Sequence, residues 1–285
     1  MIRQDSLSAQ DHIRVAEFVE AVAGIQLPEH KRSLIETRLR KRLKPTGHAS
    51  LADYLDFALS PAGAATEQPL LIDAITTNKT DFFREPAHFD FLGRLVRDRL
   101  APLQKVGWSR PLSVWSAGCS TGEEPYTLAM VLMELQQGLP GFTFTIEASD
   151  IAPSVLETAA KGIYPVANIE PIPMPLRRRY LLRSKKKELE LIRMGPELRE
   201  AVHFFPFNLR LDEYPRTPQY DIVFCRNVMI YFSNEDREMI VRQFHRALRP
   251  GGLLFIGHSE SVAHQKLGFE SVAPTIYRRI EVEGA

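Results

Sequence analysis

Two adjacent acidic side chains, Glu123 and Glu124, follow a glycine-bearing turn in the segment WSAGCSTGEEPY at 115–126. An apolar strand pattern precedes this turn and a helical pattern follows it, an arrangement that brings the backbone close to a nucleotide. Acids in the first turn of a helix suit its dipole, but they would repel a pyrophosphate that needs the same N–H groups. The segment therefore favours a nucleoside ligand that lacks phosphates and carries cationic groups.

A third acid, Asp150, ends the next apolar segment roughly 30 residues later. In a wound α/β sheet, an acid at the tip of the second strand lies beside the first turn and accepts hydrogen bonds from ribose hydroxyls. Gly118 and Gly122 depart from the Gly-x-Gly-x-x-Gly spacing of a dinucleotide site. We therefore predict a site for S-adenosylmethionine (SAM), whose sulfonium and ammonium groups suit the acids. Two structural explanations stay open: glycines that serve only strand–helix packing, and Asp150 as the N-cap of a helix near Pro153.

Polar residues also follow a later apolar strand, in the segment DIVFCRNVMIYF at 221–232. Ligands bind at the carboxyl ends of strands in open α/β sheets, so we expect Cys225, Arg226, Asn227 and Tyr231 to face the crevice. Because no histidine lies near Cys225 in the sequence to act as a base, we interpret it as a small lining residue rather than a nucleophile.

Two further segments carry polar residues. The stretch TTNKTDFFREP at 76–86 mixes small polar side chains with two phenylalanines and Arg84. Both a site-forming linker and an ordinary capped helix start with core aromatics are compatible with it. His258 follows the last apolar strand, and we expect it to be structural.

The elements that must position these residues fall into two groups. Apolar residues at helical spacing predict short helices near 13–24, 29–43, 50–60 and 70–76. From residue 111 apolar strands at 112–116, 142–148, 202–205, 221–225 and 253–257 alternate with helices at 124–135, 153–160 and 234–248. This alternation predicts an α/β fold with a mostly parallel sheet covered on both faces. The segment 177–193 does not fit it and is predicted to form an inserted two-stranded hairpin with a short turn at 184–187.

The composition is that of a globular protein. The 285 residues allow one large α/β domain and a smaller one, and the net charge of +1 gives no overall attraction to nucleic acid. No signal peptide is visible, and no run of about 18 apolar residues predicts a membrane span. With only two cysteines, we expect reduced thiols and a cytoplasmic protein.

Basic residues are concentrated between positions 30 and 44, where seven Lys or Arg face one acid, Glu36. Residues 1–75 hold nine basic and ten acidic groups, so this region is neutral but polarised. A solvated helix face, a nucleic-acid patch and a surface for an acidic protein all remain open. The absence of interleaved aromatics speaks against nucleic acid.

Four motifs together resemble the CheR family, the chemoreceptor glutamate methyltransferases of bacterial chemotaxis. They are NKTDFFR at 78–84, WSAGCSTGEEPY at 115–126, FCRNVMIYF at 224–232 and GHSE at 257–260, and they follow the family order along nearly the whole chain. The resemblance implies a Rossmann-like class I SAM methyltransferase domain with an inserted β hairpin, and an N-terminal all-α domain. It also implies transfer of the SAM methyl group to receptor glutamates, giving methyl esters and S-adenosylhomocysteine.

The resemblance also implies site residues, partners and boundaries. The SAM contacts would be Asn78, Thr80, Arg84, Gly118, Glu124, Asp150, Asn208, Leu209, Cys225 and Arg226. Arg84 and Tyr231 would act near the transferred methyl group, and Arg38 and Arg42 would dock on the cytoplasmic helical bundle of a chemoreceptor. No metal, nucleic acid or membrane insertion is implied. The expected parts are a docking domain at 1–75, a linker at 76–95 and a methyltransferase domain at 96–285, with its β-subdomain at about 176–204.

One departure from the family concerns that hairpin. Members that bind a tethering pentapeptide at the receptor C-terminus use a glycine-bearing loop there, whereas the turn SKKK at 184–187 has no glycine. We therefore expect no pentapeptide tether. The alternatives to a receptor glutamate methyltransferase are a nicotinamide-linked oxidoreductase, a non-catalytic receptor adaptor, and a SAM methyltransferase acting on another substrate.

Overall fold

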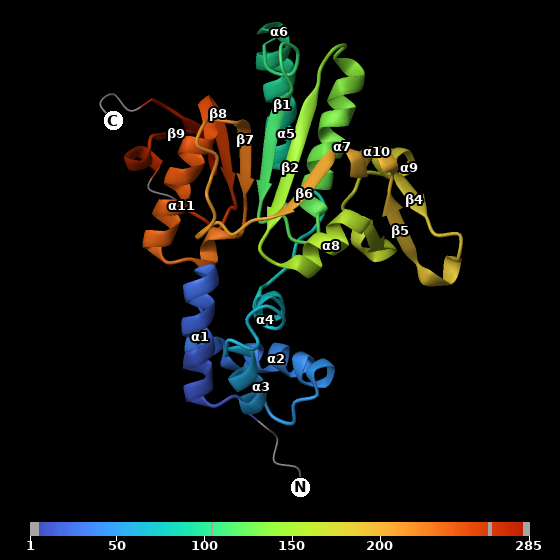
Figure 1. Cartoon of the computed structure of the whole chain (residues 1–285). Helices are drawn as coiled ribbons and strands as arrows, with labels where there is room; N and C mark the ends of the chain where they lie inside the picture. The colour runs from blue at the N-terminus through green and yellow to red at the C-terminus, as the bar shows by residue number, and fades with distance from the viewer. Residues whose placement is uncertain (1–5, 104, 262–263, 282–285) are drawn as a thin grey trace.

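The computed structural model describes residues 6–103, 105–261 and 264–281. A helical N-terminal part lies below a larger α/β part, at the edge toward which the parallel strands point (Figure 1). The carboxyl ends of these strands therefore face the N-terminal helices.

The helical part comprises α1 (Ala9–Ala23), α2 (Arg32–Thr46), α3 (Leu51–Ala58) and α4 (Gln68–Ile75), with a 3-10 turn at Glu29–Lys31. Ser8 begins α1 because its hydroxyl accepts the N–H of Asp11 at 3.0 Å, and Gly24 ends it in the left-handed conformation. Ser50 caps α3 in the same way. The apolar faces of these helices share a core that includes Val15, Val19, Leu39, Tyr54, Leu55 and Leu71.

The α/β part is built on a seven-stranded sheet in the order β6-β2-β1-β7-β8-β10-β9. Its strands are β1 (Leu112–Ala117), β2 (Phe144–Asp150), β6 (Val202–Pro206), β7 (Tyr220–Cys225), β8 (Leu248–Ile256), β9 (Phe269–Ala273) and β10 (Ile276–Arg279). The first five in that order are parallel, and β10 pairs antiparallel with β8 and β9. The predicted α/β fold is confirmed. Because β1 lies between β2 and β7, the strand order reverses there, which is where open sheets bind ligands.

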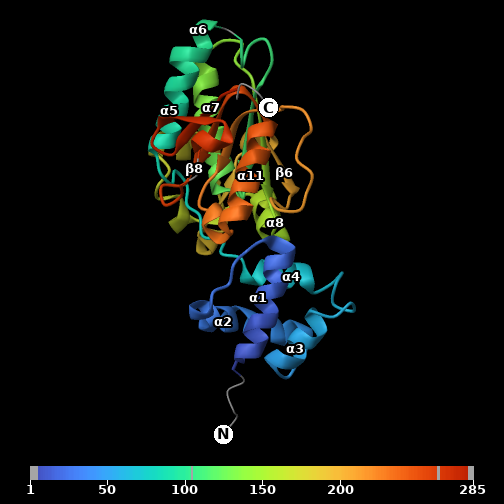
Figure 2. The ribbon, with the colours of Figure 1, turned by 90° about the vertical axis from the view of Figure 1, so that its left-hand side faces the viewer.

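Helices cover both faces of this sheet (Figure 2). On one face Phe224 packs with residues of α5 (Ala87–Leu95) and α7 (Glu123–Gly138), and on the other Val223 packs with α11 (Asn234–Ala247). Successive side chains of a strand point to opposite faces, so a strand covered on both sides is apolar throughout. The shorter elements are α8 (Pro153–Lys161), α10 (Pro196–Glu200), α6 (Ala101–Leu103), a π-helical turn at Val96–Leu100, and 3-10 turns at Val166–Ile169, Met229–Tyr231 and His264–Leu267.

The inserted subdomain is larger than the predicted hairpin. It is a three-stranded antiparallel sheet in the order β3-β5-β4, formed by β3 (Ile163–Pro165), β4 (Leu181–Arg183) and β5 (Leu191–Met194). The expected pairing of β4 with β5 is present, but residues 177–180 are helical, in α9 (Met174–Tyr180). Proline in the first turn of α9 favours that helix, and three residues of β3 are too few to show a strand period. The loop between β4 and β5 contains a 3-10 turn at Lys187–Leu189, and residues 202–204 belong to the large sheet.

Direct hydrogen bonds join the two parts of the molecule. Asn208 donates its side-chain amide to the carbonyl of Val22 at 2.7 Å, and Arg210 donates to the carbonyls of Glu20 and Ala21 at 2.8 Å each. The N–H of Gln26 donates to the carbonyl of Tyr231 at 2.8 Å. The end of α1 is thereby fixed against the loops that follow β6 and β7.

Among the described helices, none combines the length and the apolar character needed to cross a lipid bilayer.

Candidate functional site

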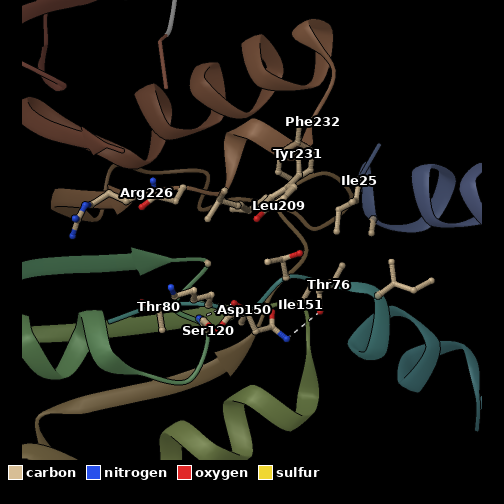
Figure 3. A pocket seen from close by; sticks show the side chains of 18 of the residues that line it. Ile25, Thr76, Thr80, Ser120, Asp150, Ile151, Leu209, Arg226, Tyr231 and Phe232 are labelled. Carbon is tan, nitrogen blue, oxygen red and sulfur yellow. Dashed lines mark hydrogen bonds between the residues drawn. The ribbon is translucent and has the colours of Figure 1, made fainter. Parts of the chain in front are cut away.

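A pocket opens at the carboxyl ends of β1, β2 and β7, and the N-terminal helices, at the right in Figure 3, close one side of it. Its wall has three sources. The strand ends contribute Gly118, Asp150 and Arg226, and the linker contributes residues 76–81 and Arg84. The helical part contributes a further group that includes Ile25, Lys31, Leu34 and Arg38. Tyr231 and Phe232 lie across the cavity from Thr80 and Asp150.

Asp150 fixes the floor of this pocket. One carboxylate oxygen accepts the N–H of Ser120 at 2.8 Å and the other accepts the N–H of Ala152 at 3.0 Å. Ala152, not Asp150, is the N-cap of α8, so Asp150 ties the glycine turn to the end of β2 instead of capping the helix. Burial, which leaves the residue 9% exposed, raises the pKa of this carboxyl.

The two acids of the first helical turn separate. Glu124 lines the pocket, where it accepts from the Ser116 hydroxyl at 2.7 Å and from the Arg226 guanidinium at 3.1 Å. Burial raises the pKa of Glu124, and the nearby Arg226 charge opposes that rise. Glu123 is buried outside the pocket wall and accepts from the Thr121 hydroxyl at 2.6 Å. Only one of the two acids therefore lines the pocket.

Arg226 bridges two carboxylates. Its side chain is 2% exposed and contacts Glu124 at 3.1 Å and Glu85 at 3.0 Å. It also donates to the carbonyl of Arg84. The guanidinium thus joins the end of β7 to α7 and to the linker, and it fixes the carboxylate of Glu124.

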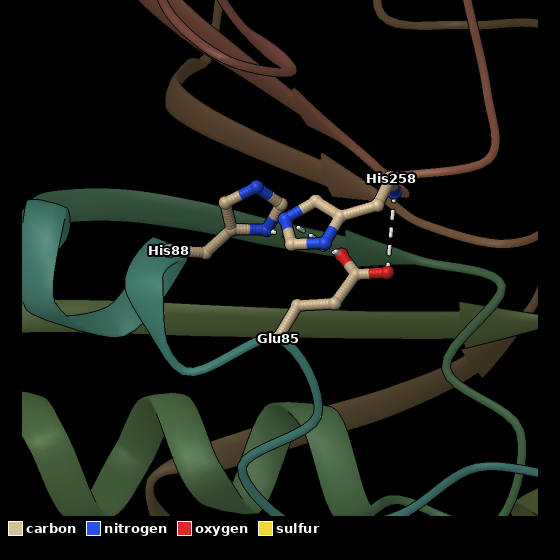
Figure 4. A group of neighbouring side chains, drawn as sticks. All are labelled: Glu85, His88 and His258. Atoms are coloured by element: carbon tan, nitrogen blue, oxygen red, sulfur yellow. Dashed lines mark hydrogen bonds and ion pairs between the residues drawn. The ribbon is translucent and has the colours of Figure 1, made fainter.

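Two histidines, His88 and His258, lie beside the carboxylate of Glu85 (Figure 4). It accepts the N–H of His258 at 3.1 Å, and Nδ1 of His88 lies 3.5 Å from its carboxylate. Burial, with help from the Arg226 charge, lowers the pKa of His88 to about 4, so His88 is neutral near pH 7. These three side chains place possible metal ligands within 4.8 Å of one another. A cation there would meet Arg226 on the same carboxylate oxygen, so the cluster fits a support for Arg226 better than a metal site.

The linker is attached to the glycine turn. Ser120 donates its hydroxyl to the carbonyl of Asn78 at 2.8 Å, and the amide of Asn78 donates to Thr76 at 3.2 Å. Arg84 lines the pocket, and its guanidinium donates to the carbonyl of Lys79 at 3.3 Å. Among the described residues, the Arg84 guanidinium has this one hydrogen bond, so most of its donors are available to the cavity.

Most of the predicted ligand-binding residues lie together in this pocket. Those that line it are Asn78, Thr80, Arg84, Gly118, Glu124, Asp150, Asn208, Leu209, Arg226 and Tyr231. Cys225 does not. It is 0% exposed, packs in a core cluster that includes Leu254, and burial raises the pKa of its thiol. The expectation that its side chain lines the crevice is wrong, because strand alternation turns it into the core.

Arg38 and Arg42 point into the molecule. Arg42 pairs with the buried Glu67 at 2.8 Å, and Tyr54 donates to the same carboxylate at 2.8 Å. Arg38 lines the pocket and donates to the carbonyls of Ile75 and Thr76, the latter at 3.2 Å. Neither placement favours the predicted receptor contact, since positions four apart share one helix face and this face packs on α4.

Several lining residues were missed by sequence reasoning. Ile151 and Phe207 directly follow β2 and β6, and the rule that strand ends bind ligands would have found them. Ile25, Lys31 and Leu34 reach the pocket only because the helical part docks on the sheet. No local pattern in the sequence signals that contact.

Comparison with known proteins shows the family of this chain. Residues 78–278 match the family described as CheR methyltransferase, SAM binding domain, and residues 10–76 match its all-alpha domain. Chemotaxis protein methyltransferase 2 of Pseudomonas aeruginosa is 38% identical over 270 residues, covering 94% of this chain and 92% of that protein. The chemotaxis protein methyltransferases of Borreliella burgdorferi and Escherichia coli are each 37% identical, covering 98% and 97% of this chain and 95% and 93% of their own. The resemblance seen in the four motifs is confirmed, and the chain belongs to the CheR methyltransferase family.

Proposed function

We propose that this enzyme transfers the methyl group of SAM to glutamate side chains on the cytoplasmic helices of chemoreceptors. The products would be glutamate methyl esters and S-adenosylhomocysteine, and the reaction would take place in the cytoplasm. The observation that carries the proposal is that Glu124, Asp150, Arg84 and Tyr231, from four separate segments, line one pocket.

The acceptor and apolar groups that line the pocket fit SAM. The two oxygens of Asp150 accept backbone N–H groups, and a carboxylate has about four lone-pair sites, so it can also accept from ribose hydroxyls. Glu124 offers negative charge for the ammonium group, and apolar Ile151, Leu209 and Val228 suit an adenine ring. When bound, SAM would supply an electrophilic methyl group on a positively charged sulfur.

The substrate needs little activation. A glutamate side chain has an unperturbed pKa of about 4.3, so it is already a carboxylate at pH 7. Its oxygen would form the new bond to the methyl carbon as the carbon–sulfur bond breaks, and no general base is required. Arg84 would orient the carboxylate through its planar fork, and the Tyr231 hydroxyl would donate a hydrogen bond beside it. We propose that no metal takes part in this step.

The proposal is tested by label transfer from methyl-labelled SAM to a panel of receptor cytoplasmic fragments. We expect label that alkali releases as methanol, and loss of label when the receptor glutamates are changed to alanine. Saturable SAM binding without any label transfer would instead indicate a receptor adaptor. Transfer only to RNA or to small molecules would assign another substrate.

Asp150→Asn is expected to weaken SAM binding by about 10- to 100-fold, the effect of losing a hydrogen bond to a charged group. The amide keeps one acceptor oxygen, which cannot serve both backbone donors and the ribose. Because burial raises the pKa of Asp150, wild-type affinity should fall as the pH drops through that raised pKa, and this dependence should shrink in the variant. Calorimetry measures both, with the exposed Asp90→Asn as the control. Equal affinities would contradict the role.

We infer that receptor helices meet the exposed side of α2, where Lys41 and Lys44 point to solvent. Reversing both charges with Lys41→Glu and Lys44→Glu is expected to raise KM for a receptor fragment several-fold, and more at low salt. SAM affinity should stay unchanged. Lys105→Glu, at an exposed position far along the chain from α2, is the control. An unchanged KM would remove this surface from the proposal.

We also propose that the enzyme acts without a pentapeptide tether. The loop between β4 and β5, residues 184–190, contains no glycine. Titration with a peptide from a receptor C-terminus is expected to give no saturable binding at the β-subdomain. A micromolar complex would contradict this.

A further inference from the structure

The buried carboxylate of Glu260 accepts hydrogen bonds from four backbone N–H groups near the pocket. Glu260 is 7% exposed. One of its oxygens accepts from Gly257 at 2.6 Å and from Asn227 at 2.9 Å, and the other accepts from Met229 at 2.8 Å and from Ile230 at 3.3 Å. Three of these donors belong to the loop that leaves β7, and the fourth follows β8.

The loop held in this way is the one that carries Tyr231. It follows Arg226, turns at Asn227 with a φ of 60° and forms a single 3-10 turn at Met229–Tyr231. A positive φ is unfavourable for a residue with a side chain, and so short a turn leaves its first N–H groups without partners in the turn. Glu260 accepts hydrogen bonds from the N–H groups of Met229 and Ile230 and thereby stabilises the loop in this conformation.

The neighbouring glycine makes the contact possible. A Cβ atom on Gly257 would lie 2.5 Å from the side-chain amide of Asn227 and 2.9 Å from the Glu260 carboxylate. Gly257 and Glu260 belong to the motif GHSE at 257–260. No role in SAM binding or receptor docking is assigned to Glu260 above. Glu260 is not part of the pocket wall, so any effect it has on the reaction passes through the loop.

We propose that Glu260 is a positioning residue for methyl transfer, which clamps the 227–231 backbone so that the Tyr231 hydroxyl lies at the site of reaction. The inference rests on the function proposed for Tyr231 and deepens it. The loop is supported from its other side as well, because the carbonyl of Tyr231 accepts the N–H of Gln26 from the helical part. The side chain of Arg226 is anchored separately by Glu85 and Glu124, so loss of the clamp should move Tyr231 more than Arg226.

The test is a double-mutant cycle between Glu260→Gln and Tyr231→Phe, measured as methyl-ester formation on a receptor fragment. Glutamine replaces one acceptor oxygen by a donor that faces two backbone N–H groups. We expect Glu260→Gln to lower kcat by about tenfold or more and SAM affinity by less than that, because Ile151 and Leu209 still line the adenine side of the pocket. Tyr231→Phe should lower kcat by about tenfold in the wild-type background and less than twofold in the Glu260→Gln background, because residues that act as a unit are not additive.

Controls separate positioning from loss of folding. Glu270→Gln removes an exposed carboxylate that pairs with Arg278 on the surface and should leave kcat unchanged. Glu260→Asp keeps the charge and should recover part of the rate; it replaces Glu260→Gln in the cycle if thermal melting shows that the glutamine variant does not fold. Additive effects of the two substitutions would overturn this inference alone. A Tyr231→Phe enzyme with wild-type kcat would overturn the role of Tyr231 and the inference with it.

Discussion

Arg226→Met is expected to lower the free energy of unfolding by about 3–5 kcal/mol, the effect of removing one partner from a buried ion pair. The substitution leaves the carboxylates of Glu85 and Glu124 without their shared cation, and each of these side chains is only 12% exposed. Methionine fills a similar volume, so the loss is electrostatic and not a cavity effect. Chemical denaturation without SAM measures it, because bound ligand would add its own stabilisation.

The pH dependence of this loss identifies its cause. Burial already raises the pKa of Glu124, and Arg226 opposes that rise, so removing Arg226 raises this pKa further. A carboxyl whose pKa is raised by folding contributes stability below its unfolded pKa and loses it as the pH rises through the folded pKa. The variant should therefore approach wild-type stability in acid and differ more as the pH rises through the raised pKa of Glu124. Arg242→Met, which removes a solvent-exposed pair with Glu238, should change stability by less than about 1 kcal/mol. A similarly small loss for Arg226→Met would mean that the two carboxylates are hydrated.

Arg84→Ala is expected to lower kcat/KM for receptor methylation by about 100-fold, the size of effect that misplacing a reactant causes. In the described part of the chain the Arg84 guanidinium has one hydrogen bond, to the carbonyl of Lys79, so its removal should leave the fold intact. Arg84→Lys should recover little of the rate, since an ammonium group lacks the planar fork that matches a carboxylate.

Initial rates with a receptor fragment, together with calorimetric SAM affinities, measure this effect. The control is Arg94→Ala, on the exposed face of α5. If Arg84→Ala kept both the wild-type rate and the wild-type SAM affinity, the assignment of Arg84 to the reacting carboxylate would be wrong.

The sequence predicts the position of a residue well where a single strand or helix determines that position. The glycine turn, the acid at the end of β2 and the polar residues after β7 could all be placed from strand and helix patterns, because parallel strands bring their carboxyl ends to one edge. The N-cap hydrogen bonds of Ser8 and Ser50 are local as well, because each spans three residues.

Long-range packing decides the surroundings of other residues, which their own elements do not reveal. Glu123 and Glu124 are neighbours in sequence, yet their positions on the helix turn one into the core and the other toward Arg226. Arg38 and Arg42 lie in a basic stretch typical of a docking surface, but they contact α4 and the linker. Charge density along the chain does not say which side of a helix will be covered.

The sequence by itself determined the class of the fold and the kind of ligand, because apolar alternation and the acids beside a glycine turn act over a few residues. Only the tertiary structure decided that Arg226 joins two acids, that α1 and α2 close the pocket, and that Glu260 supports the Tyr231 loop. These contacts join residues far apart in the chain. Their partners are chosen by how the sheet, the linker and the helical part pack, and no local pattern encodes that choice.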